Sequence, residues 1–285
     1  MRHAVLGAGG VGGLIAAVLA RSGRDVVIVA RPATVARTPT ITVDSVVLGS
    51  FEIAVPFVSA LDASVDVLWI AIKSTALEEA LTMIPAHVIG DAAVVPLLNG
   101  LDHVAVLRER YRHVVPGVMR VESERVAPGR IEQRSSFMRM DVSAREDIAA
   151  EVTDAGIACR VHDDETTMLW EKLAFLAPLA LSTTAFDAPL GVVRDDPLHL
   201  ACQVETETVA AAEGATIDTV GLEQLRAGAA NTMRSSMQND VAAGRPPELD
   251  AIGGAVQRAA ARHHIATPAT DALIDKIRSR LPAHT

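Results

Sequence analysis

A glycine-rich segment near the N-terminus has the residue types and spacing of a phosphate-binding turn. It matches the pattern G-x-G-x-x-G at Gly7, Ala8, Gly9, Gly10, Val11 and Gly12. The segment follows a strand-like run and opens a helix-like run, which is the setting that gives this pattern meaning. There, Gly7 permits a tight turn, Gly9 lets a pyrophosphate approach the backbone, and Gly12 lets the helix pack on the strand. The phosphates then meet free N–H groups at the helix N-terminus. The sequence therefore predicts a dinucleotide site; a glycine turn without a ligand is the alternative.

The residues after the second expected strand indicate which dinucleotide binds. An NAD site usually has Asp or Glu there to hold the ribose 2′-hydroxyl. This chain has Ala30, Arg31 and Pro32 instead, and Asp25 comes too early to take that role. Arg31 offers a guanidinium to a 2′-phosphate. The missing acid and the present base favour NADP(H); the alternative is that Arg31 is a solvated surface residue.

Two further polar residues follow expected strands. Lys73 comes after the apolar run Val67–Ile72, and Asn99 comes after Ala92–Leu98. Ligands of open α/β sheets bind at the carboxyl ends of such strands. We expect Lys73 to approach the cofactor ribose or phosphate, and Asn99 to contact the nicotinamide ribose or the substrate. A solvated lysine and a turn asparagine beside Gly100 are the alternatives.

The elements that must position these residues alternate between strand and helix in the first part of the chain. Expected strands are His3–Leu6, Val26–Ala30, Val65–Ile72, Ala92–Leu98 and Ala158–Val161, with a hairpin over Ile41–Val55 and more strands within Val114–Val142. Expected helices are Val11–Arg21, Ala76–Met83, Val104–Tyr111 and Ile148–Ala155. Strands separated by helices indicate βαβ units and a parallel sheet.

The pattern changes near residue 164, after which β-like runs disappear. Expected helices there cover Leu198–Glu213, Leu222–Met237, Glu248–His263 and Thr270–Leu281. The sequence thus predicts an α/β Rossmann-type dinucleotide-binding domain over residues 1–164, followed by an all-α C-terminal domain over residues 165–285.

Composition limits the function classes. The chain has 285 residues and a net charge of −9, which argues against nucleic-acid binding as its main role. Its two cysteines, Cys159 and Cys202, suit a reducing cytoplasm and neither a disulfide framework nor a metal site. The adjacent His263 and His264 cannot share a helix face, so no metal is expected. We expect a cytoplasmic protein without a membrane span; an alanine-rich helical domain leaves a homodimer open.

Over nearly its full length the sequence resembles the ketopantoate reductase (2-dehydropantoate 2-reductase) family. The glycine loop with Arg31, then Lys73 and Leu98-Asn99-Gly100, carry the first part of the resemblance. More specific are the later blocks, namely Pro128-Gly129-Arg130-Ile131, Trp170-Glu171-Lys172-Leu173, and Ser235-Ser236-Met237 with Asp240, Gly244-Arg245 and Glu248. The resemblance implies reduction of a 2-keto acid with NADPH in a cleft between a Rossmann domain and a helical domain.

The resemblance also implies site residues. Lys172 stands at the position of the family's catalytic lysine, Glu248 at its active-site glutamate, and Ser236 at its substrate-binding serine. Asn99 matches an asparagine shared by cofactor and substrate. These residue types suit the chemistry, because hydride addition to a ketone builds negative charge that an ammonium can stabilise and protonate. The alternatives are a snorkelling lysine, a first-turn helix glutamate and an ordinary helix serine.

The sequence departs from the family next to Lys172. The family has asparagines four and eight residues after its lysine, where this chain has Leu176 and Ala180. These positions share a helix face with the lysine, so that face is apolar here. Thr183 matches a family threonine and keeps one hydroxyl. We expect a helix that carries Lys172, and Pro178 falls inside it, where proline favours a kink.

The favoured function is NADPH-dependent reduction of ketopantoate to pantoate, a step of pantothenate biosynthesis, with Lys172 as general acid. Loss of two amides weakens recognition of the substrate's terminal hydroxyl. A more apolar 2-keto acid or another carbonyl compound is therefore one alternative. A non-catalytic NADP(H)-binding sensor is the other.

Overall fold

The computed structural model describes residues 1–36 and 40–281. It divides into two compact units. Unit 1 consists of Met1–Leu98 and His103–Glu165, and unit 2 consists of Asn99–Asp102 and the chain from Thr166 onwards. Asn99 therefore belongs to the same unit as Lys172, Ser236 and Glu248, although the sequence places it directly after a strand of unit 1. The two units are described separately.

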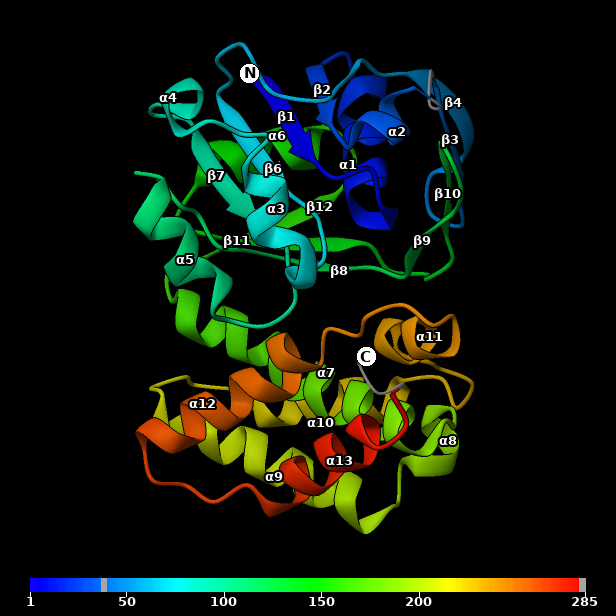
Figure 1. Ribbon diagram of the computed structural model, residues 1–285, viewed down its shortest axis with the longest axis vertical. Helices are drawn as coiled ribbons and strands as arrows, with labels where there is room; N and C mark the ends of the chain where they lie inside the picture. The colour runs from blue at the N-terminus through cyan, green and yellow to red at the C-terminus, as the bar shows by residue number, and fades with distance from the viewer. Residues whose placement is uncertain (37–39, 282–285) are drawn as a thin grey trace. The chain divides into compact units, whose positions relative to one another are not determined.

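Unit 1 is built around a five-stranded parallel sheet (Figure 1). Its strands, in spatial order, are β5 (Phe57–Val58), β2 (Asp25–Val29), β1 (Arg2–Leu6), β6 (Val67–Ile70) and β7 (Ala93–Pro96). Along the chain, β1, β2 and β5 form one after another from the centre of the sheet outwards. The chain then crosses to the other side of β1 and forms β6 and β7. This is the doubly wound order of a dinucleotide-binding fold, in which the strands are added first on one side of β1 and then on the other. The predicted Rossmann-type class is confirmed.

Both faces of this sheet are covered, because alternate residues of each strand point to opposite sides. On one side Val5, Ile28 and Trp69 pack with α1 (Gly10–Arg21) in one core cluster. On the other side Leu6 and Ile70 pack in a second cluster with residues of the helices on that face. Those helices are α3 (Leu77–Leu81), α4 (Ala86–Ile89) and α5 (His103–Arg110). The short η1 (Ser74–Ala76) precedes α3, and α2 (Pro32–Val35) follows β2.

Two smaller sheets complete unit 1. One has the order β4 (Gly49–Ala54), β3 (Thr40–Ser45), β10 (Arg130–Gln133) and β9 (Ser123–Ala127). The other has the order β12 (Ala158–His162), β11 (Arg139–Ser143) and β8 (Gly117–Arg120), with α6 (Glu146–Asp154) between β11 and β12. The expected hairpin is present as β3 and β4, but Gly49 already pairs with Ser45. Its turn is therefore residues 46–48 rather than Gly49-Ser50.

Unit 2 is helical, as predicted (Figure 1). Its elements are α7 (Glu165–Phe186), α8 (Leu190–Val193), α9 (Pro197–Ala212), α10 (Thr219–Gly228), α11 (Ser236–Ala242), the π-helical η2 (Asp250–Gly254), α12 (Ala255–Arg262) and α13 (Pro268–Arg278). The single helix expected over Leu222–Met237 is instead two, since α10 ends at Gly228 and Ser235 caps α11 by accepting a hydrogen bond from the Gln238 N–H. No helix of the described ranges is long and apolar enough to cross a membrane.

Helix α7 runs through Pro178, the position at which the sequence suggests a kink. Proline lacks an N–H, so the carbonyl of Ala174, four residues earlier, loses its helical donor. Arg226 replaces that donor, with its Nη2 3.1 Å from the Ala174 oxygen. Arg226 is itself buried and pairs with Glu207 at 2.6 Å. A side chain from α10 thus repairs the defect in α7.

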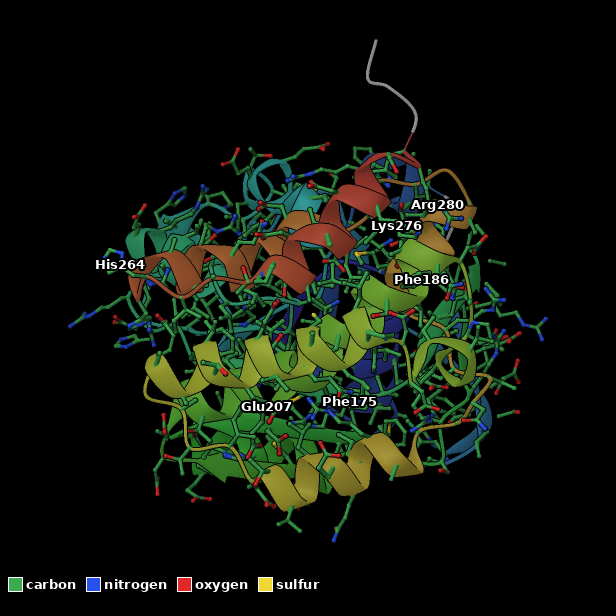
Figure 2. The ribbon with its side chains drawn as sticks, turned by 90° about the horizontal axis from the view of Figure 1, so that it is seen from below. Phe175, Phe186, Glu207, His264, Lys276 and Arg280 are labelled. Atoms are coloured by element: carbon green, nitrogen blue, oxygen red, sulfur yellow. The ribbon has the colours of Figure 1, made fainter. Side chains whose placement is uncertain are left out.

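The C-terminal end of α7 is held by side chains of the last helix, α13, and of the turn that follows it. Arg280 donates to the Ala185 carbonyl at 3.0 Å and pairs with Asp187 at 3.2 Å. Lys276 lies over the Phe186 ring, 4.8 Å from its centroid (Figure 2). Cations at a helix C-terminus satisfy its last carbonyls and oppose the negative end of its dipole. The helix that carries Lys172 is therefore held both near Pro178 and at its C-terminal end.

Candidate active-site residues

The glycine loop of unit 1 has the geometry that a phosphate-binding turn requires. Gly7 has a φ of +109°, and a Cβ there would lie 2.6 Å from Ile72. A Cβ on Gly12 would collide with the Gly7 carbonyl oxygen. Gly9 differs, because a Cβ there would meet nothing within 4 Å. At Gly7 and Gly12 the fold therefore leaves no room for a side chain. Gly9 instead faces open space, which is what the close approach of a ligand to the backbone requires.

The N-terminus of α1 is suited to an anion. Gly9 is its N-cap residue, and no acidic side chain lies in its first turn. The first N–H groups of a helix have no partner within the helix, and the helix dipole adds positive character there. Ser123 of β9 fixes the loop by donating to the Gly10 carbonyl at 2.9 Å. Ala8 and Val11 lie within the same turn, half-buried.

Arg31 and Lys73 follow the carboxyl ends of the two parallel strands that flank β1. Arg31 follows β2, and Lys73 follows β6. Both strands pair with β1, with Leu6 opposite Val29 and Ile70, so their ends share one edge with the glycine loop. Both side chains are exposed. The structure thus brings the cofactor residues predicted in unit 1 to one sheet edge.

In unit 2, Lys172 occupies the second turn of α7. It is half-buried, and the side chains of Trp170 and Leu173 beside it are 2% exposed. Ala180, two turns further on, is fully buried, and Leu176 is half-buried. The helix face that follows the lysine therefore contributes no hydrogen-bonding side chain at these two positions.

Glu248 and Asn99 form a pair across 149 residues of sequence. The Asn99 Nδ2 donates to Glu248 Oε2 at 3.1 Å. Glu248 is buried, with only 5% of its surface exposed. The loop approaches closely, because a Cβ on Gly100, whose φ is +85°, would collide with the Ala251 carbonyl oxygen of η2. Glu248 lies just before this helical segment rather than in its first turn. The sequence predicts Asn99 and Glu248 as site residues but gives no indication that they are in contact.

Ser236 lies exposed at the first position of α11. Its neighbour Ser235 is buried and lies 2.9 Å, oxygen to oxygen, from the Thr183 hydroxyl. Thr183 also donates to the Leu179 carbonyl at 2.8 Å. The one hydroxyl that remains at the family's threonine position is therefore engaged internally, where it ties α7 to the start of α11.

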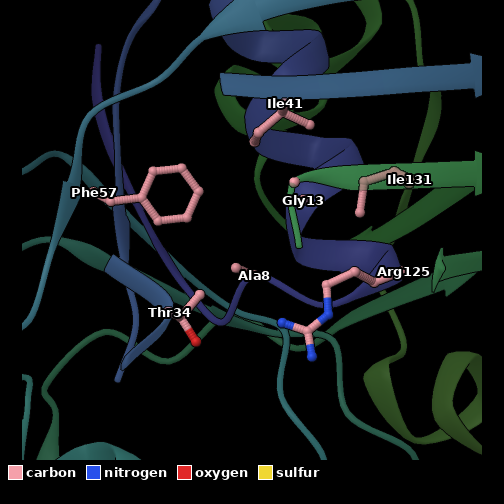
Figure 3. A pocket seen from close by; sticks show the side chains of 8 residues that line it. Ala8, Gly13, Thr34, Ile41, Phe57, Arg125 and Ile131 are labelled. Carbon is pink, nitrogen blue, oxygen red and sulfur yellow. The ribbon is translucent and has the colours of Figure 1, made fainter. Parts of the chain in front are cut away.

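One candidate residue was missed. Arg125 of β9 lines a recess beside Ala8 of the glycine loop, together with Thr34 of α2 (Figure 3). A strand residue two positions after a loop contact shares its face, but nothing in the sequence shows that Ser123 touches the loop. The signal therefore appears only once the fold is known.

Comparison with known proteins agrees with both units. The family model for ketopantoate reductase PanE/ApbA matches residues 3–146, and the model for its C-terminal part matches residues 164–280. The chain belongs to the ketopantoate reductase family.

Individual relatives extend over the whole chain. It is 33% identical over 279 residues to a 2-dehydropantoate 2-reductase of Caulobacter vibrioides, covering 93% of this chain and 94% of that protein. The crystal structure of 2-dehydropantoate 2-reductase from Geobacter metallireducens GS-15 aligns with a TM-score of 0.87 at 25% identity, over 98% and 99% of the two chains. A ternary structure of D-mandelate dehydrogenase with NADH and anilino(oxo)acetate shares the fold, with a TM-score of 0.88 at 20% identity over 98% of each chain.

Proposed function

We propose that this protein reduces a 2-keto acid with NADPH, and that the acid is 2-dehydropantoate (ketopantoate), giving pantoate. Family membership and the Caulobacter vibrioides relative support the reaction. The observation that carries it is the buried Asn99–Glu248 pair in the unit that also holds Lys172. A buried carboxylate is costly unless it has partners and a role. Both members of the pair stand where the family has active-site residues.

The residues of unit 1 fit a nicotinamide dinucleotide. The N–H groups at the start of α1 would hold the pyrophosphate, and the space over Gly9 admits it. Arg31 would pair with the 2′-phosphate that distinguishes NADP from NAD. Lys73 would contact the ribose or a phosphate. A reduced nicotinamide held by these residues would supply the hydride for the carbonyl carbon.

The residues of unit 2 would act on the ketone. As the carbonyl carbon gains a hydride, its oxygen becomes negative, and the Lys172 ammonium would stabilise that charge and deliver the proton from Nζ. Glu248 would accept a hydrogen bond from a substrate hydroxyl or orient the lysine, with Asn99 holding the carboxylate in place. The Ser236 hydroxyl would bind the substrate carboxylate.

The test is NADPH oxidation with ketopantoate by the wild type and by Lys172→Ala. We expect turnover to fall by more than about a hundredfold, the usual scale for a positioned general acid. Lys276→Ala is the matched control, because Lys276 lies over Phe186 at the far end of α7 and should leave turnover unchanged. Full activity of Lys172→Ala would contradict the assignment.

A second candidate substrate class, an apolar 2-keto acid, is favoured by Leu176 and the buried Ala180. The decisive comparison is ketopantoate against 3,3-dimethyl-2-oxobutanoate, which differs from it only by lacking the terminal hydroxyl. A site built to bind that hydroxyl rejects the analogue by about 10⁴-fold or more, whereas an apolar site discriminates weakly. Similar kcat/KM values for the two acids, or a preference for the analogue, would indicate an apolar 2-keto acid as the substrate. The proposed reduction by NADPH would be unaffected.

A further inference from the structure

Strand β9 directs one arginine toward the glycine loop. Ser123 touches the loop through its hydrogen bond to the Gly10 carbonyl. Arg125, two residues later, points to the same face because strand side chains alternate. It lies opposite Ile131 of β10, whose side chain would be 2.8 Å from a Cβ on Gly13 of α1. The face that packs on α1 thus carries a guanidinium near its edge.

That guanidinium lines a recess in unit 1. The recess is shallow, and its wall consists of Ala8, Gly13, Thr34, Ile41, Phe57, Arg125, Gly129 and Ile131. Figure 3 shows the guanidinium turned toward Ala8 of the glycine loop and the Thr34 side chain of α2. The remaining lining is apolar or backbone, so Arg125 supplies the formal charge of the recess.

The charges around Arg125 indicate an anionic ligand. Other arginines of this sheet region are paired: Arg130 with Asp44 at 3.1 Å, and Arg134 with Glu132 at 2.6 Å. For Arg125 the structure records no such partner within residues 1–36 and 40–281. In a chain with a net charge of −9, an exposed arginine left without a carboxylate beside an anion-binding loop is suited to a phosphate group.

The position of the recess indicates which phosphate of the dinucleotide Arg125 would contact. Thr34 belongs to α2, which begins directly after Arg31 at the carboxyl end of β2. In dinucleotide folds the end of the second strand holds the adenosine ribose, while the pyrophosphate takes the first helix N-terminus. The recess thus lies on the ribose side of the loop. We propose that Arg125 is a second guanidinium for the 2′-phosphate of NADP(H), acting with Arg31 to set preference over NAD(H); this rests on the proposed function.

The experiment measures dissociation constants of NADPH and NADH by the change in their fluorescence, without substrate. We expect Arg125→Ala to weaken NADPH about tenfold, the scale of one charge-assisted hydrogen bond at ~1.4 kcal/mol per tenfold, and NADH less than twofold. Arg125→Lys should recover part of the loss. Arg134→Ala is the matched control, since it removes the same charge from a neighbouring position where Glu132 and Glu124 already neutralise it; both constants should stay unchanged.

A competition arm uses 2′,5′-ADP and 5′-ADP, which differ only in the position carrying the second phosphate. Arg125→Ala should weaken the 2′-phosphorylated nucleotide relative to wild type and leave 5′-ADP unchanged, and added salt should shrink the difference. Thermal unfolding of each variant checks that the fold persists.

The outcomes separate this inference from the proposed function. Equal losses for NADPH and NADH would overturn the inference, because they would place Arg125 on the pyrophosphate. An unchanged NADPH constant in Arg125→Ala, alongside a large loss in Arg31→Ala, would also overturn it while leaving NADP(H) as the cofactor. A wild type that binds NADH as tightly as NADPH would overturn the NADP assignment itself.

Discussion

The proposed cofactor residues of unit 1 and the proposed substrate residues of unit 2 are built in different ways. In unit 1 the binding turn is a contiguous stretch whose backbone does the work, and its glycines are dictated by close approaches such as that of Gly12 to the Gly7 carbonyl. In unit 2 the site residues come from segments far apart in sequence, as with Asn99 and Glu248. A contiguous backbone turn tolerates few substitutions, whereas a set of separate side chains can change one member at a time. Leu176 and Ala180 are changes of that second kind.

The largest effect should come from adding one methyl group to the turn. Gly12→Ala forces a Cβ against the Gly7 carbonyl, so we expect a loss of about 3 kcal/mol in unfolding free energy, the upper range for overpacking, and no measurable NADPH binding. Gly9→Ala is the matched variant, because its Cβ meets nothing within 4 Å. It should fold with a cost within about 1 kcal/mol but still weaken NADPH at least tenfold.

Denaturant unfolding and NADPH titration together check this pair. If Gly9→Ala bound NADPH as tightly as the wild type, the open space over Gly9 would not be the seat of the pyrophosphate. If Gly12→Ala kept full stability, the backbone would have adjusted, and the contrast between the two units would weaken.

An intermediate effect should follow from removing the side chain that repairs α7. Arg226→Ala leaves the Ala174 carbonyl and Glu207 without their partner. Deleting one member of a buried pair costs 3–5 kcal/mol, and since Glu207 is partly exposed we expect about 2 kcal/mol. The loss should appear in helix unfolding followed by circular dichroism. The NADPH dissociation constant should stay unchanged, because the proposed cofactor residues lie in unit 1.

The control for this prediction is Glu223→Ala. Glu223 pairs with the same arginine but is 68% exposed, so its loss should cost no more than about 0.5 kcal/mol. An Arg226→Ala variant as stable as the wild type would mean that water replaces the guanidinium at Ala174, and that Pro178 needs no side-chain repair.

The two units also differ in how much of the fold and of the candidate site could be predicted from the sequence. The glycine turn, Arg31 and Lys73 are defined by local pattern, and the strands that position them alternate clearly enough to predict the sheet. The family resemblance supplied Lys172, Ser236 and Glu248, since no local pattern marks them. What the sequence could not supply were contacts between distant segments: the Asn99–Glu248 hydrogen bond, the Thr183–Ser235 contact and the placement of Arg125. The break between α10 and α11 was also missed, because periodic apolar residues continue through it.

Unit 1 also contains a buried polar network that lies away from the glycine turn, around His3 near the amino end of β1. The Trp69 Nε1–H donates to His3 Nδ1 at 3.2 Å, and His3 Nε2 lies 3.3 Å from Glu151. His3 is fully buried. With Nδ1 accepting, the neutral ring donates from Nε2 to the carboxylate, so every polar atom of the imidazole is used.

The smallest predicted effect is the pH dependence of this network. Burial lowers the pKa of His3 below 6.5, and the Glu151 carboxylate compensates only in part. The unfolded chain therefore binds a proton at a higher pH than the folded chain does, so stability is full above pH 6.5 and falls as the pH drops below it. Protonation at Nδ1 would also set two N–H groups against each other, His3 against Trp69.

We expect His3 to lower the unfolding free energy progressively as the pH falls from 7.5 to 5, because the unfolded chain takes up the proton first. The measurement is the slope of stability against pH for the wild type and for His3→Gln, which cannot titrate. Comparing slopes cancels the other histidines and any constant cost of the substitution. Because His3 lies at the amino end of β1, the NADPH constant at pH 8 should be the same in both proteins. Parallel slopes would mean that the histidine titrates alike in both states; a changed NADPH constant would mean that this network, too, serves the cofactor site.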